Sequence, residues 1–149
     1  MEGCLACDLA EGRVPLPGGV ILETGHWLVE HNVGPLGVGA LIVKPRRHVV
    51  HVWELTGEES AELGPLLVRV AGALAAVTSP DQVYVTLWSH MDGVPVHIHW
   101  VVQAVTRALM DETGLYGPRL QLALIERGER PPAAEVEPLA ALVRAELAR

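Results

Sequence analysis

The chain has little of several residues on which common enzyme mechanisms depend. Its 149 residues include no phenylalanine, three serines and a single lysine, Lys44. None of the serines lies in a Gly-x-Ser-x-Gly turn, which excludes the nucleophile elbow of the α/β-hydrolases. Schiff-base chemistry has one candidate, Lys44, and this residue lies in an apolar, strand-like run. Histidine is frequent by contrast, because the chain has seven, and their placement carries most of the information about function.

Positive charge and long apolar runs are also scarce. The 11 basic and 18 acidic residues give a net charge of −7, which argues against non-specific binding of nucleic acid or anionic membranes. No apolar run reaches the roughly 18 residues that a membrane span needs, because Arg69 interrupts the longest candidate, Leu66–Val77. The first twelve residues carry acids where a signal peptide has a basic segment. We therefore expect a cytoplasmic protein whose partners include neither nucleic acid nor membrane.

One domain accounts for the length and composition of the chain. Half of its residues are apolar and 19% are charged, so it is long and apolar enough to bury a core. No repeat, low-complexity tract or long linker divides it, and we expect residues 1–149 to form a single domain. Short apolar runs bounded by turn residues predict several strands. These strands are Val20–Glu23, Trp27–His31, Ala40–Lys44, Val83–Trp88 and Val96–Val105.

Helical signals are clear in two places. The Thr-Gly-Glu-Glu run at 56–59 is a capping box, and apolar residues follow it at helical spacing to about Val77. Pro65 is expected to bend this helix because its ring removes one backbone hydrogen bond. A C-terminal helix is predicted over Pro138–Arg149, whereas Leu120–Ile125 fits either a strand or a helix. Strands that pair antiparallel around one long helix predict an α+β fold.

Two histidines share one face of a predicted strand. Side chains alternate along a strand, so His97 and His99 point one way and Ile98 and Trp100 the other. The two imidazoles are then about 6.6 Å apart along the strand. This arrangement suits a shared metal ion, or one metal ligand beside one reactive histidine. Two half-exposed histidines without chemistry would give the same pattern.

The N-terminal Cys4-x-x-Cys7 motif sharpens the choice. In a cytoplasmic chain such a motif is a redox pair or half of a zinc site. A thioredoxin-like dithiol follows a strand and opens a helix, and no strand precedes Cys4, so we favour a metal site. A structural zinc ion then needs two more nitrogen or sulfur ligands. The candidates are His48, His51, His97 and His99.

Three elements in this order resemble the histidine triad (HIT) superfamily. They are Cys4-x-x-Cys7, the run V-K-P-R-R-H that ends at His48, and the run H-I-H-W-V-V that begins at His97. The resemblance covers about residues 4–105. It implies an α+β homodimer whose antiparallel sheet of about five strands carries one long helix and a C-terminal helix. It also implies nucleotide binding and activity as a nucleotidyl hydrolase or transferase.

The zinc-bearing branch of the superfamily implies a role for each matched residue. Cys4, Cys7, His48 and His97 would hold a structural zinc ion, and His99 would be the nucleophile that attacks the α-phosphate. The histidine would then carry the nucleotide covalently for part of the cycle. A neutral imidazole with an ordinary pKa of about 6.5 is a suitable nucleophile toward phosphorus. Zinc would orient the strand without acting as a Lewis acid.

The resemblance also indicates residues that would bind the nucleotide. Asn32 lies where the family places an acidic or amide side chain for the ribose hydroxyls. The segment Ser89–Pro95, predicted as a turn-rich loop, stands where the family has its phosphate-binding loop. His90 and Gly93 in this segment are therefore expected to contact the substrate.

Two departures from the family pattern bear on catalysis. Val101 replaces the third histidine of the triad, and Ala40 replaces a histidine that precedes the V-K-P-R-R-H run. In the family both residues contact phosphate or assist the leaving group. One alternative is therefore a zinc-stabilised nucleotide-binding protein with little or no turnover. Another is a purely structural Cys2His2 zinc domain in which His97 and His99 are both ligands.

Overall fold

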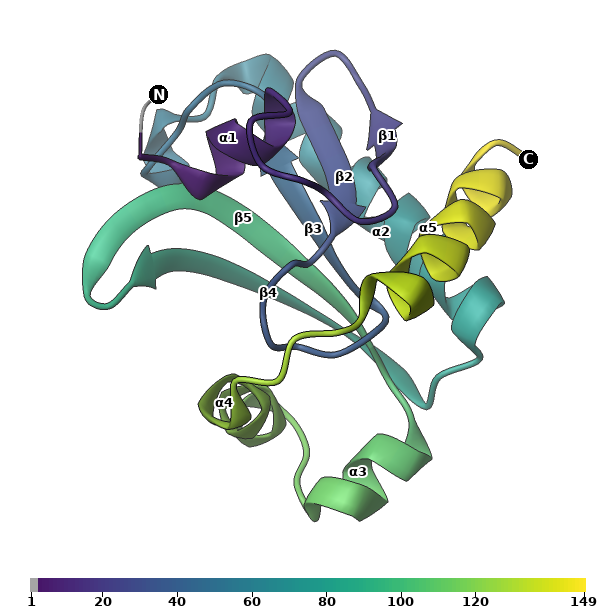
Figure 1. Ribbon diagram of the computed structural model, residues 1–149. Coiled ribbons are helices and arrows are strands. Elements are labelled where there is room, and N and C mark those ends of the chain that lie inside the picture. The colour runs from purple at the N-terminus through teal and green to yellow at the C-terminus, as the bar shows by residue number, and fades with distance from the viewer. Residues whose placement is uncertain (1–2) are drawn as a thin grey trace.

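A five-stranded antiparallel sheet organises the protein. The computed structural model describes residues 3–149, and within them the strands lie in the order β1-β2-β3-β5-β4 (Figure 1). The strands are β1 (Val20–Glu23), β2 (Trp27–His31), β3 (Ala40–Pro45), β4 (Gln82–Met91) and β5 (Val94–Val105). The helices are α1 (Leu5–Ala10), α2 (Gly57–Thr78), α3 (Arg107–Thr113), α4 (Pro118–Arg127) and α5 (Ala133–Leu147), with a 3-10 turn at Val52–Glu54. The predicted α+β class is confirmed.

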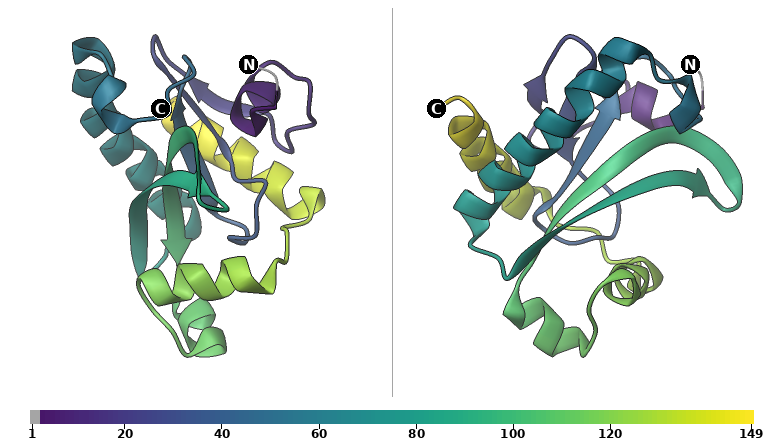
Figure 2. Two further views of the ribbon diagram at one scale, coloured as in Figure 1. Left: turned by 90° about the vertical axis from the view of Figure 1, so that its left-hand side faces the viewer. Right: turned by 180° about the vertical axis from the view of Figure 1, so that it is seen from behind.

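The long helix α2 crosses one face of the sheet, as the view from behind in Figure 2 shows. Its capping box is present, because Thr56 accepts a hydrogen bond from the Glu59 backbone N–H and the Glu59 carboxylate accepts one from that of Thr56. The helix runs through Pro65 as one element. By length and composition α2 would also suit a membrane span, but Val70 and Leu74 are buried in the core that it forms with the sheet and α5.

The opposite face of the sheet is covered in part by α4. Leu120 and Leu124 of this helix pack against a second apolar cluster, formed by Leu36, Ala40, Ile42, Val101 and Val105. The ambiguous segment Leu120–Ile125 is therefore helical, and Gly117 and Gly128 bound the helix. Polar contacts join it to the sheet as well, since Gln121 Nε2 donates to Gln103 Oε1 at 3.0 Å.

The hairpin of β4 and β5 corrects a sequence prediction. Ser89–Pro95 was expected to be a turn-rich loop, but β4 continues to Met91 and β5 begins at Val94. Only Asp92 and Gly93 connect the strands, with φ of 52° and 77°. An Asp-Gly pair with positive φ at both positions forms the tight turn that matches strand twist, so the strands extend to the tip.

Three helices also differ from the sequence prediction. The helices α1 and α3 were not predicted, because six or seven residues are too few to display helical periodicity. The C-terminal helix begins at Ala133, five residues before Pro138. A proline in the second turn costs this helix one hydrogen bond, and burial of Val136, Val143 and Leu147 offsets the loss.

Candidate metal centre and active site

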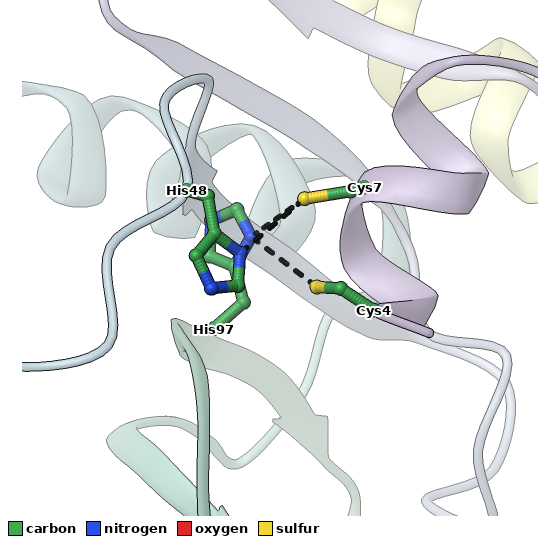
Figure 3. Close-up of side chains that lie close together, drawn as sticks. All are labelled: Cys4, Cys7, His48 and His97. Carbon is green, nitrogen blue, oxygen red and sulfur yellow. Dashed lines mark hydrogen bonds between the residues drawn. The ribbon is translucent and has the colours of Figure 1, made fainter. Parts of the chain in front are cut away.

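Four predicted metal ligands meet at one point of the structure. Cys4 and Cys7 come from the start of α1, His48 from the loop after β3, and His97 from β5 (Figure 3). The four ligand atoms lie within 4.8 Å of one another. Cys7 Sγ is 3.4 Å from His48 Nδ1 and 3.6 Å from His97 Nδ1, and Cys4 Sγ is 3.8 Å from His97 Nδ1. Residues up to 93 positions apart thus form one cluster.

The cluster fits a structural zinc ion. A tetrahedral ion with Zn–S of about 2.3 Å and Zn–N of about 2.0–2.1 Å holds sulfur and nitrogen ligands about 3.6 Å apart, which is the observed spacing. His97 Nε2 donates to the Pro45 carbonyl at 3.0 Å, so its Nδ1 keeps the lone pair that a metal requires. Four protein ligands leave no coordination position for a substrate, which is typical of a structural site.

Burial acts in opposite ways on the two kinds of ligand in this cluster. It lowers the pKa of His97 to about 4, so the imidazole is neutral at pH 7 and available as a ligand. Burial also raises the pKa of the Cys7 thiol. Since zinc binds the thiolate, metal binding at this site releases a proton and becomes weaker as pH falls.

His99 lies next to the cluster but is not part of it. Its Nδ1 donates to the His97 carbonyl at 3.1 Å, which assigns the proton to Nδ1 and leaves the lone pair on Nε2. Within residues 3–149 we find no hydrogen-bond partner for Nε2. Burial lowers the pKa of His99 and so favours the neutral ring, although the side chain stays partly exposed. The ring is therefore held in the form that a nucleophile needs.

Comparison with solved structures identifies the fold. No family model and no curated protein sequence matches the chain. A zinc-bound histidine triad family protein from Mycobacterium smegmatis matches with a TM-score of 0.69 and 21% identity, over 98% of this chain and 94% of that one. A HIT-like protein from Bartonella henselae matches with a TM-score of 0.73 and 14% identity, over 98% and 97%. A hypothetical histidine triad nucleotide-binding protein from Sulfolobus tokodaii matches with a TM-score of 0.73 and 16% identity, over 97% and 92%.

The chain has the histidine triad fold. The predicted fold and the predicted structural zinc are both confirmed, because the four zinc candidates form one cluster of suitable geometry. His51, also weighed as a ligand, is not in the cluster and stacks on Trp53 with ring centroids 4.4 Å apart. The alternative in which His97 and His99 both hold the metal disagrees with the structure, since His48 occupies the fourth position.

The three predicted nucleotide-binding residues, Asn32, His90 and Gly93, do not lie together in the structure. Asn32 follows β2 and lines a cavity of about 260 Å³ together with Leu5. Its Oδ1 accepts from the Gly34 N–H, whereas its Nδ2 is buried and has no partner in the described part of the chain. His90 and Gly93 are exposed near the tip of the β4–β5 hairpin. His31, next to Asn32, pairs with Leu41, which pairs in turn with Val102 of β5, whereas His90 pairs with Pro95. Val102 and Pro95 are seven residues apart, which is about 23 Å of strand.

The two departures from the triad pattern have a packing reason. Val101 and Ala40 are 1% and 0% exposed, and both belong to the apolar cluster under α4. Leu120 and Leu124 pack against this cluster from the helix. Histidines at these two positions would place polar rings in an apolar cluster, which costs free energy unless they find partners. Apolar side chains at positions 101 and 40 therefore allow α4 to pack on this face of the sheet.

A buried ion pair near the zinc cluster was missed from the sequence. Lys44 Nζ is 2.7 Å from Glu30 Oε1 and also donates to the Ala6 carbonyl at 2.8 Å. Burial raises the pKa of the Glu30 carboxyl, and the charge of Lys44 opposes this shift. An ammonium held in this way is not a free amine, so the structure gives no support to Schiff-base chemistry at Lys44. The only sequence signal was a lysine inside an apolar strand.

Proposed function

We propose that the protein is a nucleotide-binding member of the histidine triad family that cleaves or transfers a nucleotide at its α-phosphate through His99. The observation that carries this proposal is the state of the His99 ring, with Nδ1–H bonded to the His97 carbonyl and Nε2 free among the described residues. The fold supports nucleotide as the ligand class, because one structural neighbour is described as a histidine triad nucleotide-binding protein. The cavity beside Asn32 is the proposed ribose site.

The proposed reaction has two displacements at phosphorus. The lone pair of His99 Nε2 forms a bond to the α-phosphorus while the bond to the leaving group breaks, and that group departs with the electron pair. The His97 carbonyl accepts the hydrogen bond of Nδ1–H throughout and stabilises the positive ring. Water then attacks phosphorus, the N–P electrons return to Nε2, and the proton of the water passes to solvent.

The metal cluster has a supporting role in this proposal. Zinc supplies no chemistry to the displacement, because a bound ion would be closed by four protein ligands. Its ligand His97 precedes His99 by two residues, and the His97 carbonyl orients the His99 ring. The chain around the cluster thus fixes the position of the proposed nucleophile.

Nucleotide binding with little turnover is the second candidate function. Two observations favour it: α4 covers Val101 and Ala40, and the Asp92–Gly93 turn leaves no loop to surround a phosphate. Without donors on that side, the charge that develops on the leaving group has no stabilising partner. Under this alternative the His99 ring would contact the phosphate without forming a bond to it.

Turnover and covalent labelling separate the two candidates. We expect purified protein to hydrolyse a nucleoside 5′-phosphoramidate and to carry acid-labile label after mixing with the α-³²P-labelled substrate. His99→Asn should keep its zinc and bind nucleoside monophosphate within a few-fold, yet lose label and turnover by several orders of magnitude. His26→Asn is the matched control, since this histidine pairs with Glu62 and is not among the predicted site residues. Nucleotide affinity without turnover in the parent would favour the binding protein instead.

We also propose that two copies of this chain associate through β4. This strand is one of the two edge strands of the sheet, and Val85 and Leu87 on it are 43% and 42% exposed. An apolar edge strand readily pairs with a second copy of itself. Sedimentation equilibrium should give twice the 16.0 kDa chain mass for the parent and a monomer for Leu87→Lys. Leu122→Lys on the exposed side of α4 is the control, and an unchanged dimer in Leu87→Lys would contradict the proposed interface.

A cytoplasmic location follows from the same site in this proposal. Cys4 and Cys7 are both free and serve as the proposed zinc ligands. Thiols stay reduced in the cytoplasm, whereas an oxidising compartment would convert neighbouring cysteines into a disulfide. Fractionation of cells that produce the protein, followed by immunoblotting, tests this location.

A further inference from the structure

The helix that carries both zinc cysteines is attached to the sheet by one buried lysine. Lys44 on β3 is 1% exposed, and its Nζ donates to the Ala6 carbonyl at 2.8 Å. Ala6 lies between Cys4 and Cys7 in the chain. The same ammonium lies 2.7 Å from Glu30 Oε1 on β2. Two central strands thus hold the short segment from which both sulfur ligands project.

The buried ion pair of Lys44 and Glu30 contributes little net free energy to folding. Glu30 is 2% exposed, and its Oε2 has no hydrogen-bond partner in the part of the chain that the structure describes. Replacing a buried ion pair by apolar side chains of similar size is often neutral or stabilising. A buried pair with an unsatisfied oxygen therefore calls for a role beyond the free energy of folding.

The helix α1 needs such a support. It has six residues and no side-chain cap at its N-terminus. A helix of this length is unstable by itself, because nucleation costs more than its few hydrogen bonds return. Without an attachment between them, Cys4 and Cys7 would sample many positions relative to His48 and His97 before metal arrives.

We propose that Lys44, held in place by Glu30, is a positioning residue of the zinc site. It attaches Ala6 to the sheet and keeps both cysteine sulfurs next to the two histidines in the metal-free protein. Zinc then binds a preformed site and need not order the N-terminus itself. The proposal concerns metal affinity alone, so it can fail or hold independently of the proposed chemistry at His99.

Zinc affinity in two variants tests this proposal. Lys44→Met should bind zinc about 10–100-fold more weakly in a chelator competition, the range found for residues that orient metal ligands. The double variant Glu30→Met/Lys44→Met removes the unpaired buried carboxylate, so its melting temperature should recover toward that of the parent. Its zinc affinity should stay low, because the bond to Ala6 is still missing. Parent-like affinity in the double variant would overturn the proposal.

A matched core variant separates positioning from stability. Val70→Ala in α2 truncates a fully buried side chain of a core cluster that includes no residue of α1, and it should destabilise the protein. We expect Val70→Ala to keep parent zinc affinity at a temperature where it is folded. If its affinity falls as much as that of Lys44→Met, the effect of Lys44 is merely structural.

The unmodified protein provides a test that does not depend on any variant. After zinc is removed with a chelator, hydrogen exchange can follow the amides of Asp8 and Glu11, which bond to the carbonyls of Cys4 and Cys7. The proposal expects these amides to remain protected in the metal-free chain. Exchange at the rate of an unfolded peptide, with the sheet still protected, would show that metal and not Lys44 orders α1.

Discussion

Three histidines of this protein, His31, His97 and His99, have different roles although burial affects each of them in the same direction. Burial lowers the pKa values of His31, His97 and His99 in turn, yet each ring has different partners. His97 directs Nδ1 at the cysteines, and His99 keeps Nε2 free among the described residues. His31 uses both nitrogens, because Nδ1 donates to the Asn32 carbonyl at 2.8 Å and Nε2 accepts from the Gly39 N–H at 3.0 Å. Hydrogen bonding thus assigns the role of each ring.

The pH dependence of stability should reveal the neutral state of His31. Since the folded pKa lies below the unfolded value of about 6.5, the unfolded chain takes up a proton first as pH falls. The contribution of His31 to stability is therefore complete above about pH 6.5 and decreases as pH falls below it. Urea unfolding at pH 8 to 5 should give a smaller loss of free energy for His31→Gln than for the parent.

The control for this prediction is His90→Gln on the exposed hairpin. This variant should follow the parent across the whole pH range, because the exposed His90 side chain has no hydrogen-bond partner within residues 3–149. Identical pH profiles for the parent and His31→Gln would mean that the imidazole of His31 is protonated equally in both states.

At the scale of secondary structure, α4 decides what stands beside the proposed nucleophile. The helix packs Leu120 and Leu124 against the strand face that carries Val101. Its buried Gln121 bonds to Gln103, and Gln103 Nε2 donates in turn to the Leu36 carbonyl. Helix, strand and loop are therefore joined by apolar and polar contacts at one place.

A histidine placed at position 101 should destabilise this protein. Val101→His puts a larger, polar ring into a fully buried apolar cluster, so the free energy of unfolding should fall by about 2 kcal/mol or more. We expect no gain in phosphoramidate hydrolysis, which a coupled assay measures beside urea unfolding. Val101→Ile controls for added volume. A stable Val101→His protein with faster turnover would mean that α4 moves away from β5.

At the scale of the whole molecule, the segment that follows α1 packs against the C-terminal helix α5. The segment after α1 runs beside α5, and Arg144 donates to the carbonyls of Gly18 and Val20. Gly18 has φ of +78°, and a Cβ added there would lie 2.5 Å from the Cβ of Ala140. This close approach joins the N-terminal segment, which carries the zinc cysteines, to the C-terminal helix.

Gly18→Ala tests how much this contact contributes. The left-handed backbone costs an L-residue about 1–2 kcal/mol, and the clash with Ala140 adds to that cost. We expect a lower melting temperature by calorimetry. Gly18→Ala/Ala140→Gly should recover the part due to the clash but not the part due to φ. Gly25→Ala, where nothing lies within 4 Å and φ is ordinary, is the control. Equal melting temperatures for Gly18→Ala and Gly25→Ala would contradict the prediction.

Local patterns in the sequence determined much of this protein. Short apolar runs and turn residues located the strands, and the capping box located the start of α2, because both depend on neighbours along the chain. The order of the cysteine and histidine motifs along the chain carried the family resemblance that predicted the zinc ligands, and the four predicted residues form one cluster. Only the tertiary structure decided the conformation of α1 and α4 and the residue type that fits at position 101. Lys44, on a distant strand, holds the six-residue helix α1 by a hydrogen bond to Ala6. The segment of α4 is helical because its leucines pack on the sheet in that form, and a valine is found at position 101 because α4 covers this position with apolar side chains. These outcomes depend on contacts between residues far apart in sequence, which no local preference encodes.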